Sequence, residues 1–148
     1  MTKLHVALAM AAAMAVATPA FAQDDSLKLL SGAWRMTSLE VGNAAGELEP
    51  IEYSGQIVFT DAGTMSVQAM NPDADAAATP YTANGYEAFY GTVTIDEAAK
   101  TFVVTVESSL ARTMIGQGFE RAFQVSEDQL VLTPTNPEES WRVTYERQ

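Results

Sequence analysis

The chain has 148 residues and a formal net charge of −11, from 19 acidic and 8 basic side chains. This charge argues against nucleic acid as a partner, because binding to a phosphate backbone needs a basic face. The sequence contains no cysteine, so the fold has to be stabilised by packing and hydrogen bonds and not by disulfides. His5 is the only histidine.

The first residues have the three parts of a secretory signal. Lys3 and His5 give a basic start, which an apolar run over residues 6–17 follows. An Ala-Phe-Ala triplet then precedes Gln23 as a cleavage motif. The apolar run is about a dozen residues long, shorter than the roughly 20 that span a bilayer as a helix. We therefore expect a cleaved signal peptide, a periplasmic or secreted mature protein, and no stable membrane insertion after cleavage.

Cleavage of residues 1–22 would leave one domain over residues 23–148, a usual size for a single hydrophobic core. The removed segment holds one of the eight basic residues, Lys3, and no acidic residue, so the remainder carries a formal charge of −12. Cleavage would also remove His5, the only histidine. The mature domain then lacks the groups for Ser–His or Cys–His catalysis, for zinc sites built on these residues and for haem ligation by histidine. We expect neither a metal nor a cofactor.

Residues 24–30 predict one or two helical turns, and the rest of the chain predicts short β-strands separated by turn residues. The predicted strands are residues 33–41, 55–60, 64–70, 86–95, 101–109, 119–125, 129–133 and 140–147. No long amphipathic helix and no internal repeat interrupts them. Eight short strands with turns at such intervals are typical of an all-β antiparallel sandwich or barrel.

The clearest hairpin has its turn at residues 61–63, where Gly63 tolerates a positive φ. On the strand that follows this turn, Met65, Val67 and Ala69 share one face and polar residues share the other. This alternation predicts a strand with one buried and one solvated face.

Three longer segments are predicted as loops. Residues 42–52 contain several acidic residues and Pro50, and residues 110–118 have mixed character. The longest loop, residues 71–84, has two prolines and no strand periodicity. It is either a binding loop or lid, or a surface excursion without such a role.

Short motifs follow one another along nearly the whole mature chain: Leu30-x-Gly32-x-Trp34-Arg35, Gly55-x-Ile57-Val58-Phe59-Thr60, Gly85-Tyr86-x-Ala88-Phe89-Tyr90 and Asp128-x-Leu130-x-Leu132-Thr133. In this order they resemble the lipocalin-like domains of bacterial and fungal exported proteins. The resemblance implies an eight-stranded antiparallel lipocalin-like barrel that holds either a small apolar molecule or a packed interior. Relatives often carry adjacent histidines where this chain has Val104 and Thr105, so no histidine chemistry is implied here.

Arg121 is the most informative charged residue. It alternates in step with Phe119 and Phe123, so it should point inward if that face of its strand lines the core. A buried guanidinium needs a partner, because burying an unpaired charge is costly. Glu107, near the end of the preceding strand, is the predicted partner. Such an ion pair would either fix the strand register or offer a polar anchor to a ligand.

Aromatic and methionine residues supply the other candidate ligand contacts. Besides Arg121 and Glu107, the candidates are Tyr86, Phe89, Tyr90, Met65, Met114 and Phe119, with Tyr81 in the same aromatic cluster. Such a set is typical of an apolar pocket, but equally of the filled interior of a small barrel. Trp34 is predicted to be structural, at the narrow end of the barrel, and Arg35 and Arg142 are predicted to face solvent.

The function that these patterns favour is binding of a small apolar or amphipathic molecule at the open end of the barrel. One alternative is an isomerase or cyclase that uses the same cavity, with Glu107 and Tyr90 as acid–base groups. Another is a non-enzymatic module that meets an envelope protein through a sheet edge or through residues 71–84. The sequence favours binding over catalysis, and it indicates neither the ligand nor the oligomeric state.

Overall fold

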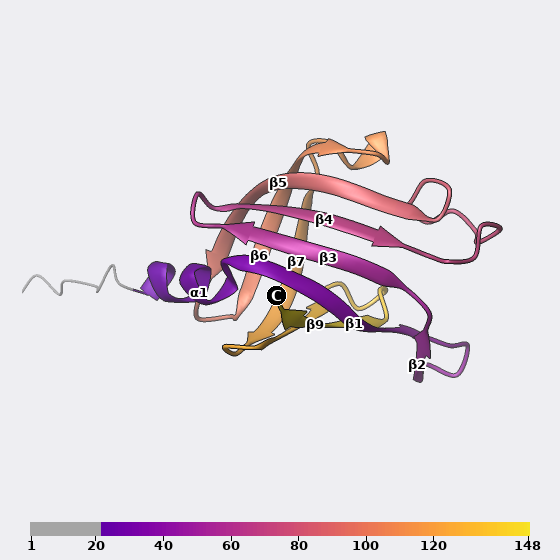
Figure 1. The fold of residues 1–148 in the computed structure, drawn as a ribbon, viewed down its shortest axis with the longest axis horizontal. Coiled ribbons are helices and arrows are strands. Elements are labelled where there is room, and N and C mark those ends of the chain that lie inside the picture. The colour runs from indigo at the N-terminus through magenta and orange to yellow at the C-terminus, as the bar shows by residue number, and fades with distance from the viewer. Residues whose placement is uncertain (1–21) are drawn as a thin grey trace, which may run out of the picture.

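The computed structural model describes residues 22–148, so the predicted signal peptide, residues 1–22, lies outside the described residues except for Ala22. A helix, α1 (Ala22–Leu30), precedes nine strands (Figure 1). The strands are β1 (Gly32–Gly42), β2 (Leu48–Ile51), β3 (Ser54–Thr60), β4 (Thr64–Met70), β5 (Tyr86–Asp96), β6 (Thr101–Ser109), β7 (Gly118–Val125), β8 (Gln129–Pro134) and β9 (Trp141–Arg147). A 3-10 turn, η1 (Arg112–Met114), follows β6.

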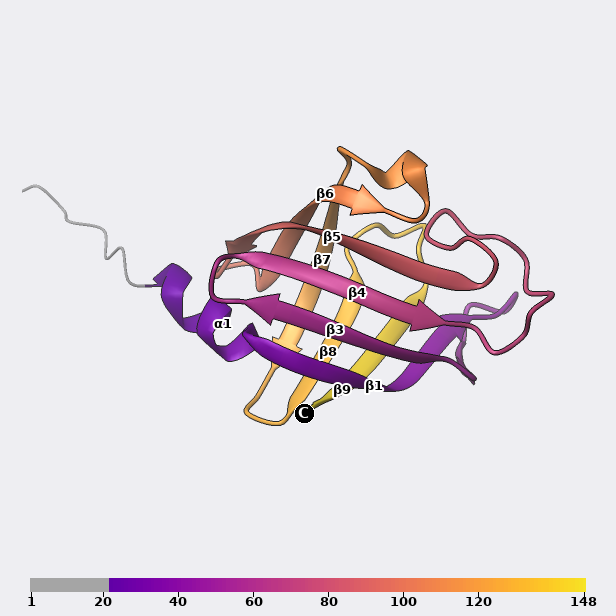
Figure 2. The same cartoon turned by 45° about the horizontal axis from the view of Figure 1, so that its top comes forward.

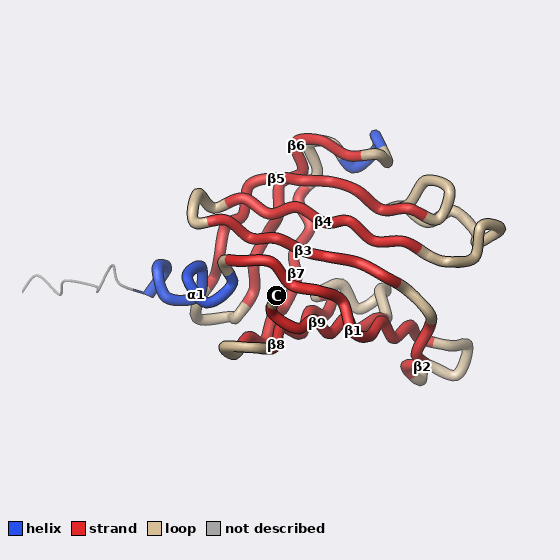
Figure 3. The backbone as a smooth tube through the Cα atoms, in the orientation of Figure 1, coloured by secondary structure: helices blue, strands red, loops and turns tan. Residues whose placement is uncertain are grey.

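The strands form a closed antiparallel barrel. From β3 to β9 each strand pairs with the next, β3 also pairs with β1, and β1 pairs with β9 to complete the ring. This gives eight barrel strands, β1 and β3 to β9, which curve around one interior in Figure 3. The predicted all-β, eight-stranded barrel is therefore confirmed.

Side-chain alternation determines what fills the interior. On β4, Met65, Val67 and Ala69 are buried, whereas the residues between them are partly or fully exposed, as predicted. The turn into β4 has Gly63 at φ +75°, a conformation that residues with a Cβ rarely adopt. One face of the strand therefore lines the barrel and the other meets solvent.

Strand β2 corrects the prediction of a continuous loop over residues 42–52. Leu48–Ile51 pairs with the last residues of β1 as a ninth strand outside the ring of eight, and Pro50 lies opposite Glu40. Proline cannot donate a ladder hydrogen bond, which made a strand unexpected here. A short edge strand accommodates proline, because only one of its sides is paired.

Helix α1 covers one end of the barrel beside the buried Trp34. The Trp34 side chain is fully buried, and its indole Nε1–H donates to the Leu30 carbonyl at 2.7 Å. The guanidinium of Arg147 lies 3.9 Å from the centre of the Trp34 ring and donates to the carbonyls of Leu29 and Ser31 at the end of the helix. The prediction that Trp34 is structural is consistent with this packing.

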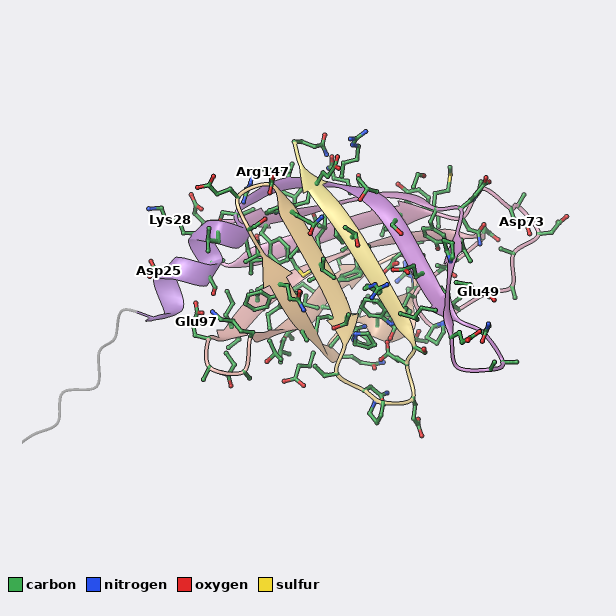
Figure 4. All side chains as sticks on the ribbon, turned by 90° about the horizontal axis from the view of Figure 1, so that it is seen from below. Asp25, Lys28, Glu49, Asp73, Glu97 and Arg147 are labelled. Atoms are coloured by element: carbon green, nitrogen blue, oxygen red, sulfur yellow. The ribbon has the colours of Figure 1, made fainter. Side chains whose placement is uncertain are left out.

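A second contact holds the same helix to the barrel. The Ser26 N–H and hydroxyl both donate to the Glu97 carboxylate, in the turn between β5 and β6, at 2.9 and 2.5 Å. Figure 4 shows Glu97 and Arg147 beside α1, and Glu49 and Asp73 at the far end of the barrel. The segment between β4 and β5, residues 71–85, extends from that far end (Figure 2). One end of the barrel is thus closed by the helix, and loops surround the other.

Candidate functional site

A cavity of about 390 Å³ lies inside the barrel. Every barrel strand contributes to its wall, which is mostly apolar and includes Met36, Ile57, Val67, Phe89, Leu132 and Val143. Residues of the loop between β4 and β5, among them Pro80 and Tyr81, also line it. The interior is therefore an open cavity and not a completely filled core, the two alternatives that the sequence left open. Its size is within the usual range for small-molecule sites.

Aromatic rings pack together toward the α1 end of the barrel, where Phe59 lies opposite Gly32, the first residue of β1. Phe59 and Phe102 meet edge to face with their centroids 5.5 Å apart, and Phe123 lies 6.2 Å from Phe102. All three side chains are buried. Because these rings occupy the barrel next to the helix, the free space lies toward the loop-lined end.

Arg121, on β7, lies at the cavity wall within a cluster of aromatic rings. Its side chain is 13% exposed. The guanidinium carbon lies 5.0 Å from the ring centre of Trp141, 5.6 Å from that of Phe119 and 5.7 Å from that of Tyr81. At such distances a cation is attracted to the ring faces. The inward orientation predicted for Arg121 is confirmed.

The charge of Arg121 is balanced by Glu139, which lies in the segment between β8 and β9. The Arg121 Nη2 atom is 3.6 Å from Glu139 Oε2 and also donates to the Tyr81 hydroxyl at 3.2 Å. The Tyr81 hydroxyl and the Trp141 Nε1–H each donate to Glu139 at 2.9 Å. Burial opposes ionisation of Glu139, but these two hydrogen bonds and the charge of Arg121 together hold its pKa below the usual value.

A second carboxyl, Glu87 on β5, also lines the cavity. It is partly buried, and among the described side chains, those of residues 25–148, none forms a hydrogen bond or an ion pair with its carboxylate. Burial raises the pKa of Glu87 to about 7, and the charge of Arg121 offsets this only in part. Sequence reasoning missed Glu87, although it alternates in step with Phe89, which was predicted to line the pocket.

The negative charge of Glu87 also affects the pKa of two tyrosines of the cavity wall. Burial, followed by the negative charge of Glu87, raises the pKa of both Tyr145 and Tyr53. Neither hydroxyl makes a hydrogen bond to another side chain in the described part of the chain. The cavity therefore contains one carboxyl and two phenol groups without side-chain partners, in a wall that is otherwise mainly apolar.

Among the described side chains, those of residues 25–148, no group of three or more acidic or histidine residues is arranged to hold a metal ion. Among the same residues, no helix has the length and apolar character needed to cross a membrane.

Comparisons with known proteins agree with this architecture. The sequence profile of the lipocalin-like domain matches residues 31–147, a range that includes every barrel strand. The chain belongs to the lipocalin-like domain family. No curated protein matches the sequence.

Several solved structures are similar to this chain at low sequence identity. A lipocalin-like protein from Bacteroides uniformis is 15% identical, with a TM-score of 0.50 over 81% of this chain and 99% of that one. An uncharacterized protein from Bacteroides eggerthii is 13% identical, with a TM-score of 0.49 over 80% and 99%. A redesigned β-barrel is 18% identical, with a TM-score of 0.48 over 88% and 99%.

The lipocalin-like barrel brings some of the predicted ligand-contact residues together and separates others. Those that line the cavity are Arg121, Phe89, Met65, Met114 and Phe119. The other three, Glu107, Tyr86 and Tyr90, are exposed and do not line it. Whether the first five bind a ligand stays a prediction.

The predicted ion pair between Arg121 and Glu107 is wrong, because the alternation of side chains along β6 places Glu107 on the outer face of the barrel. On β6 the even-numbered residues Val104 and Val106 are buried, so Glu107 points to solvent. The register also separates the two, because Arg121 lies opposite Phe102. The actual partner, Glu139, lies in a turn that strand periodicity does not cover.

The same alternation of side chains places Tyr86 and Tyr90 on the outer face of β5. Their exposed fractions are 36% and 49%, whereas Glu87 and Phe89 between them face the cavity. Glu107 and Tyr90 therefore do not form the acid–base pair that the enzyme alternative required. The expectation that Arg35 and Arg142 face solvent is confirmed, with 64% and 46% of their side chains exposed.

Replacing Arg121 with alanine should lower the free energy of unfolding by about 1–3 kcal/mol, because Glu139 would lose its charged partner in a partly buried site. Replacing Arg142 is the matched control. Arg142 pairs with Glu40 on the outer face, and its loss should cost less than that of Arg121, because solvent screens an exposed ion pair. Urea unfolding of both variants measures the difference. Equal losses would mean that the Arg121 cluster adds no more stability than a surface ion pair.

Proposed function

We propose that this lipocalin-like protein binds a small, mainly apolar molecule inside its barrel, and that it does so in the periplasm or outside the cell. The observation that carries the proposal is the cavity of about 390 Å³ with its mostly apolar wall. Each methylene group that a ligand buries in such a wall contributes about 0.8 kcal/mol. A molecule with a short hydrocarbon part would therefore have a substantial driving force for entry.

The loop-lined end of the barrel offers the route into the cavity. The loop between β4 and β5 contributes Ala76, Ala77 and Pro80 to the wall, so a ligand would contact this loop as well as the strands. Tyr81 of the same loop is held by its hydrogen bonds to Arg121 and Glu139. The loop is thus anchored to the barrel beside the cavity, an arrangement that fits a binding loop better than a free surface excursion.

The proposed location rests on the sequence of the first 22 residues, with its basic start, apolar run and Ala-Phe-Ala triplet. A chain without cysteine needs no disulfide formation after export. Comparing the mass of the purified protein with that of the full chain would test cleavage after residue 22. Retention of the full mass in the native host would contradict it.

Filling the cavity should strongly weaken binding. Ala69 is buried and lines the cavity, so an Ala69→Phe substitution should weaken the binding of a neutral fluorescent probe, N-phenyl-1-naphthylamine, at least tenfold. The control is Gln68→Phe, which adds the same ring on the exposed face of the same strand. Circular dichroism would establish that both variants keep the strand content of the wild type.

The expected result is a large increase in probe fluorescence for the wild type and the control, and a small one for Ala69→Phe. If the wild type does not bind the probe, or if the two variants lose binding equally, the barrel interior is not the binding site. Native mass spectrometry of protein purified from its own host would then show whether a small molecule accompanies the protein at all.

A further inference from the structure

The charges around the cavity limit the kind of polar group that a ligand can carry. Glu87 and Arg121 are the only charged residues of the cavity wall in the described part of the chain. Arg121 already has an ion pair with Glu139 and a hydrogen bond to Tyr81. Its positive charge is therefore compensated before a ligand arrives, and the three ionised side chains together leave one negative charge.

Glu87 carries that excess charge and lacks a partner. Buried carboxylates are normally paired or hydrogen-bonded, because an isolated one is costly. Burial shifts the pKa of Glu87 to about 7, which reflects this cost. The Tyr145 and Tyr53 hydroxyls also lack side-chain partners among the described side chains, those of residues 25–148, and burial together with the charge of Glu87 raises the pKa of both. These three groups are oxygen acceptors that face an apolar cavity.

A carboxylate ligand does not fit this arrangement. Its charge would be repelled by Glu87, and to reach Arg121 it would have to compete with Glu139. The formal charge of −12 on residues 23–148 adds a long-range repulsion. A protonated amine, in contrast, has three N–H donors and a positive charge, so it can pair with a carboxylate and donate to phenol oxygens as well.

We propose that the ligand is an apolar molecule with a protonated amino group. This group forms an ion pair with Glu87 and donates hydrogen bonds to the hydroxyls of Tyr145 and Tyr53. The inference rests on the proposed function, because it needs a ligand inside the barrel. The apolar part of the ligand then lies along the aliphatic and aromatic wall, and the amine supplies the partner that Glu87 lacks in the protein itself.

Three ligands of equal chain length test this inference: decylamine, 1-decanol and decanoic acid. Each is titrated against protein loaded with N-phenyl-1-naphthylamine, and displacement of the probe gives the affinity. The proteins are the wild type, Glu87→Gln and, as control, Glu107→Gln, which removes one exposed negative charge from the outer face. Titrations are made at pH 6 and pH 8.

We expect decylamine to bind the wild type most tightly and decanoic acid least tightly at pH 8. Between pH 6 and pH 8 the affinity for decylamine should rise about tenfold, because Glu87 with a pKa of about 7 ionises over this range while the amine stays protonated. Glu87→Gln should lose at least tenfold in decylamine affinity and most of the pH dependence, but keep its affinity for 1-decanol. The Glu107→Gln control should behave as the wild type.

Different results would contradict the amine inference and the proposed function. If the wild type binds the probe but prefers decanoic acid, or if Glu87→Gln binds decylamine as the wild type does, the amine inference is wrong and a binding cavity remains. If the probe is bound but none of the three compounds displaces it, the amine inference is also wrong. If the wild type does not bind the probe at all, the proposed function itself is wrong.

Discussion

Glu87→Gln should stabilise the ligand-free protein at pH 8 by as much as about 3 kcal/mol, and should change its stability little at pH 5. The pKa of Glu87 is raised from 4.5 to about 7 in the folded state. Between these values the unfolded chain gives up the proton while the folded protein retains it. The unfolded state therefore binds fewer protons, and the stability of the wild type falls as the pH rises from 4.5 to 7. Glutamine does not titrate, so the variant avoids this loss.

Urea unfolding at pH 5, 6, 7 and 8 gives the free energy of unfolding of both proteins. The difference between Glu87→Gln and the wild type should grow with pH and level off above pH 7. The Glu107→Gln variant is the control, because it removes an equal charge from an exposed position. Its difference from the wild type should stay small at every pH. A constant difference between wild type and Glu87→Gln from pH 5 to pH 8 would show that the Glu87 carboxyl is solvated like an ordinary surface group.

A carboxyl that destabilises the empty barrel fits a role in binding. Residues at ligand sites commonly reduce stability, because they are arranged for a partner that is absent from the free protein. An amine ligand would supply the missing charge and so stabilise the folded state in addition to its own burial. The stability gain of Glu87→Gln without ligand and its loss of decylamine binding are two independent consequences of the same unpaired carboxyl.

Much of the barrel was predictable from the period of two along the strands. That period placed Met65 and Val67 inside and gave Arg121 its inward orientation, because local alternation alone determines which side of a strand faces the core. Where the alternation was not applied, the prediction failed. The aromatic character of Tyr86 and Tyr90 suggests a pocket wall, but Phe89 lies between them on the opposite face of the strand, which lines the cavity.

Other features depend on contacts between segments far apart in the sequence. Glu139 reaches Arg121 only because the turn between β8 and β9 lies next to β7 and to the loop that carries Tyr81. No periodicity links positions 81, 121 and 139. The existence of the cavity was equally beyond the sequence, because the same apolar residues can fill a small barrel or surround a void. The three-dimensional arrangement of these residues decides whether a cavity forms. Here Phe59 and Phe102 pack together toward the α1 end, and the space at the other end stays open.

The closed end should be far more sensitive to mutation than the loop-lined end. Trp34→Ala should lower the free energy of unfolding by about 3–5 kcal/mol, the range for truncation of a large buried aromatic side chain. The substitution removes the ring that packs under Arg147 and the indole N–H that donates to Leu30, so it also weakens the attachment of α1. Trp34→Phe retains an aromatic ring and loses the hydrogen bond, and it should cost about 1–2 kcal/mol.

Guanidinium unfolding of the two Trp34 variants, of Arg147→Met and of Trp34→Ala combined with Arg147→Met would separate these contributions. The two side chains are in contact, so the loss in the double variant should be smaller than the sum of the single losses by about 0.5–3 kcal/mol. Strict additivity would show that the cation and the ring do not stabilise each other. A cost below about 1 kcal/mol for Trp34→Ala would show that the barrel is closed by its strands alone, because neither the indole nor the docking of α1 would then contribute to the stability of the fold.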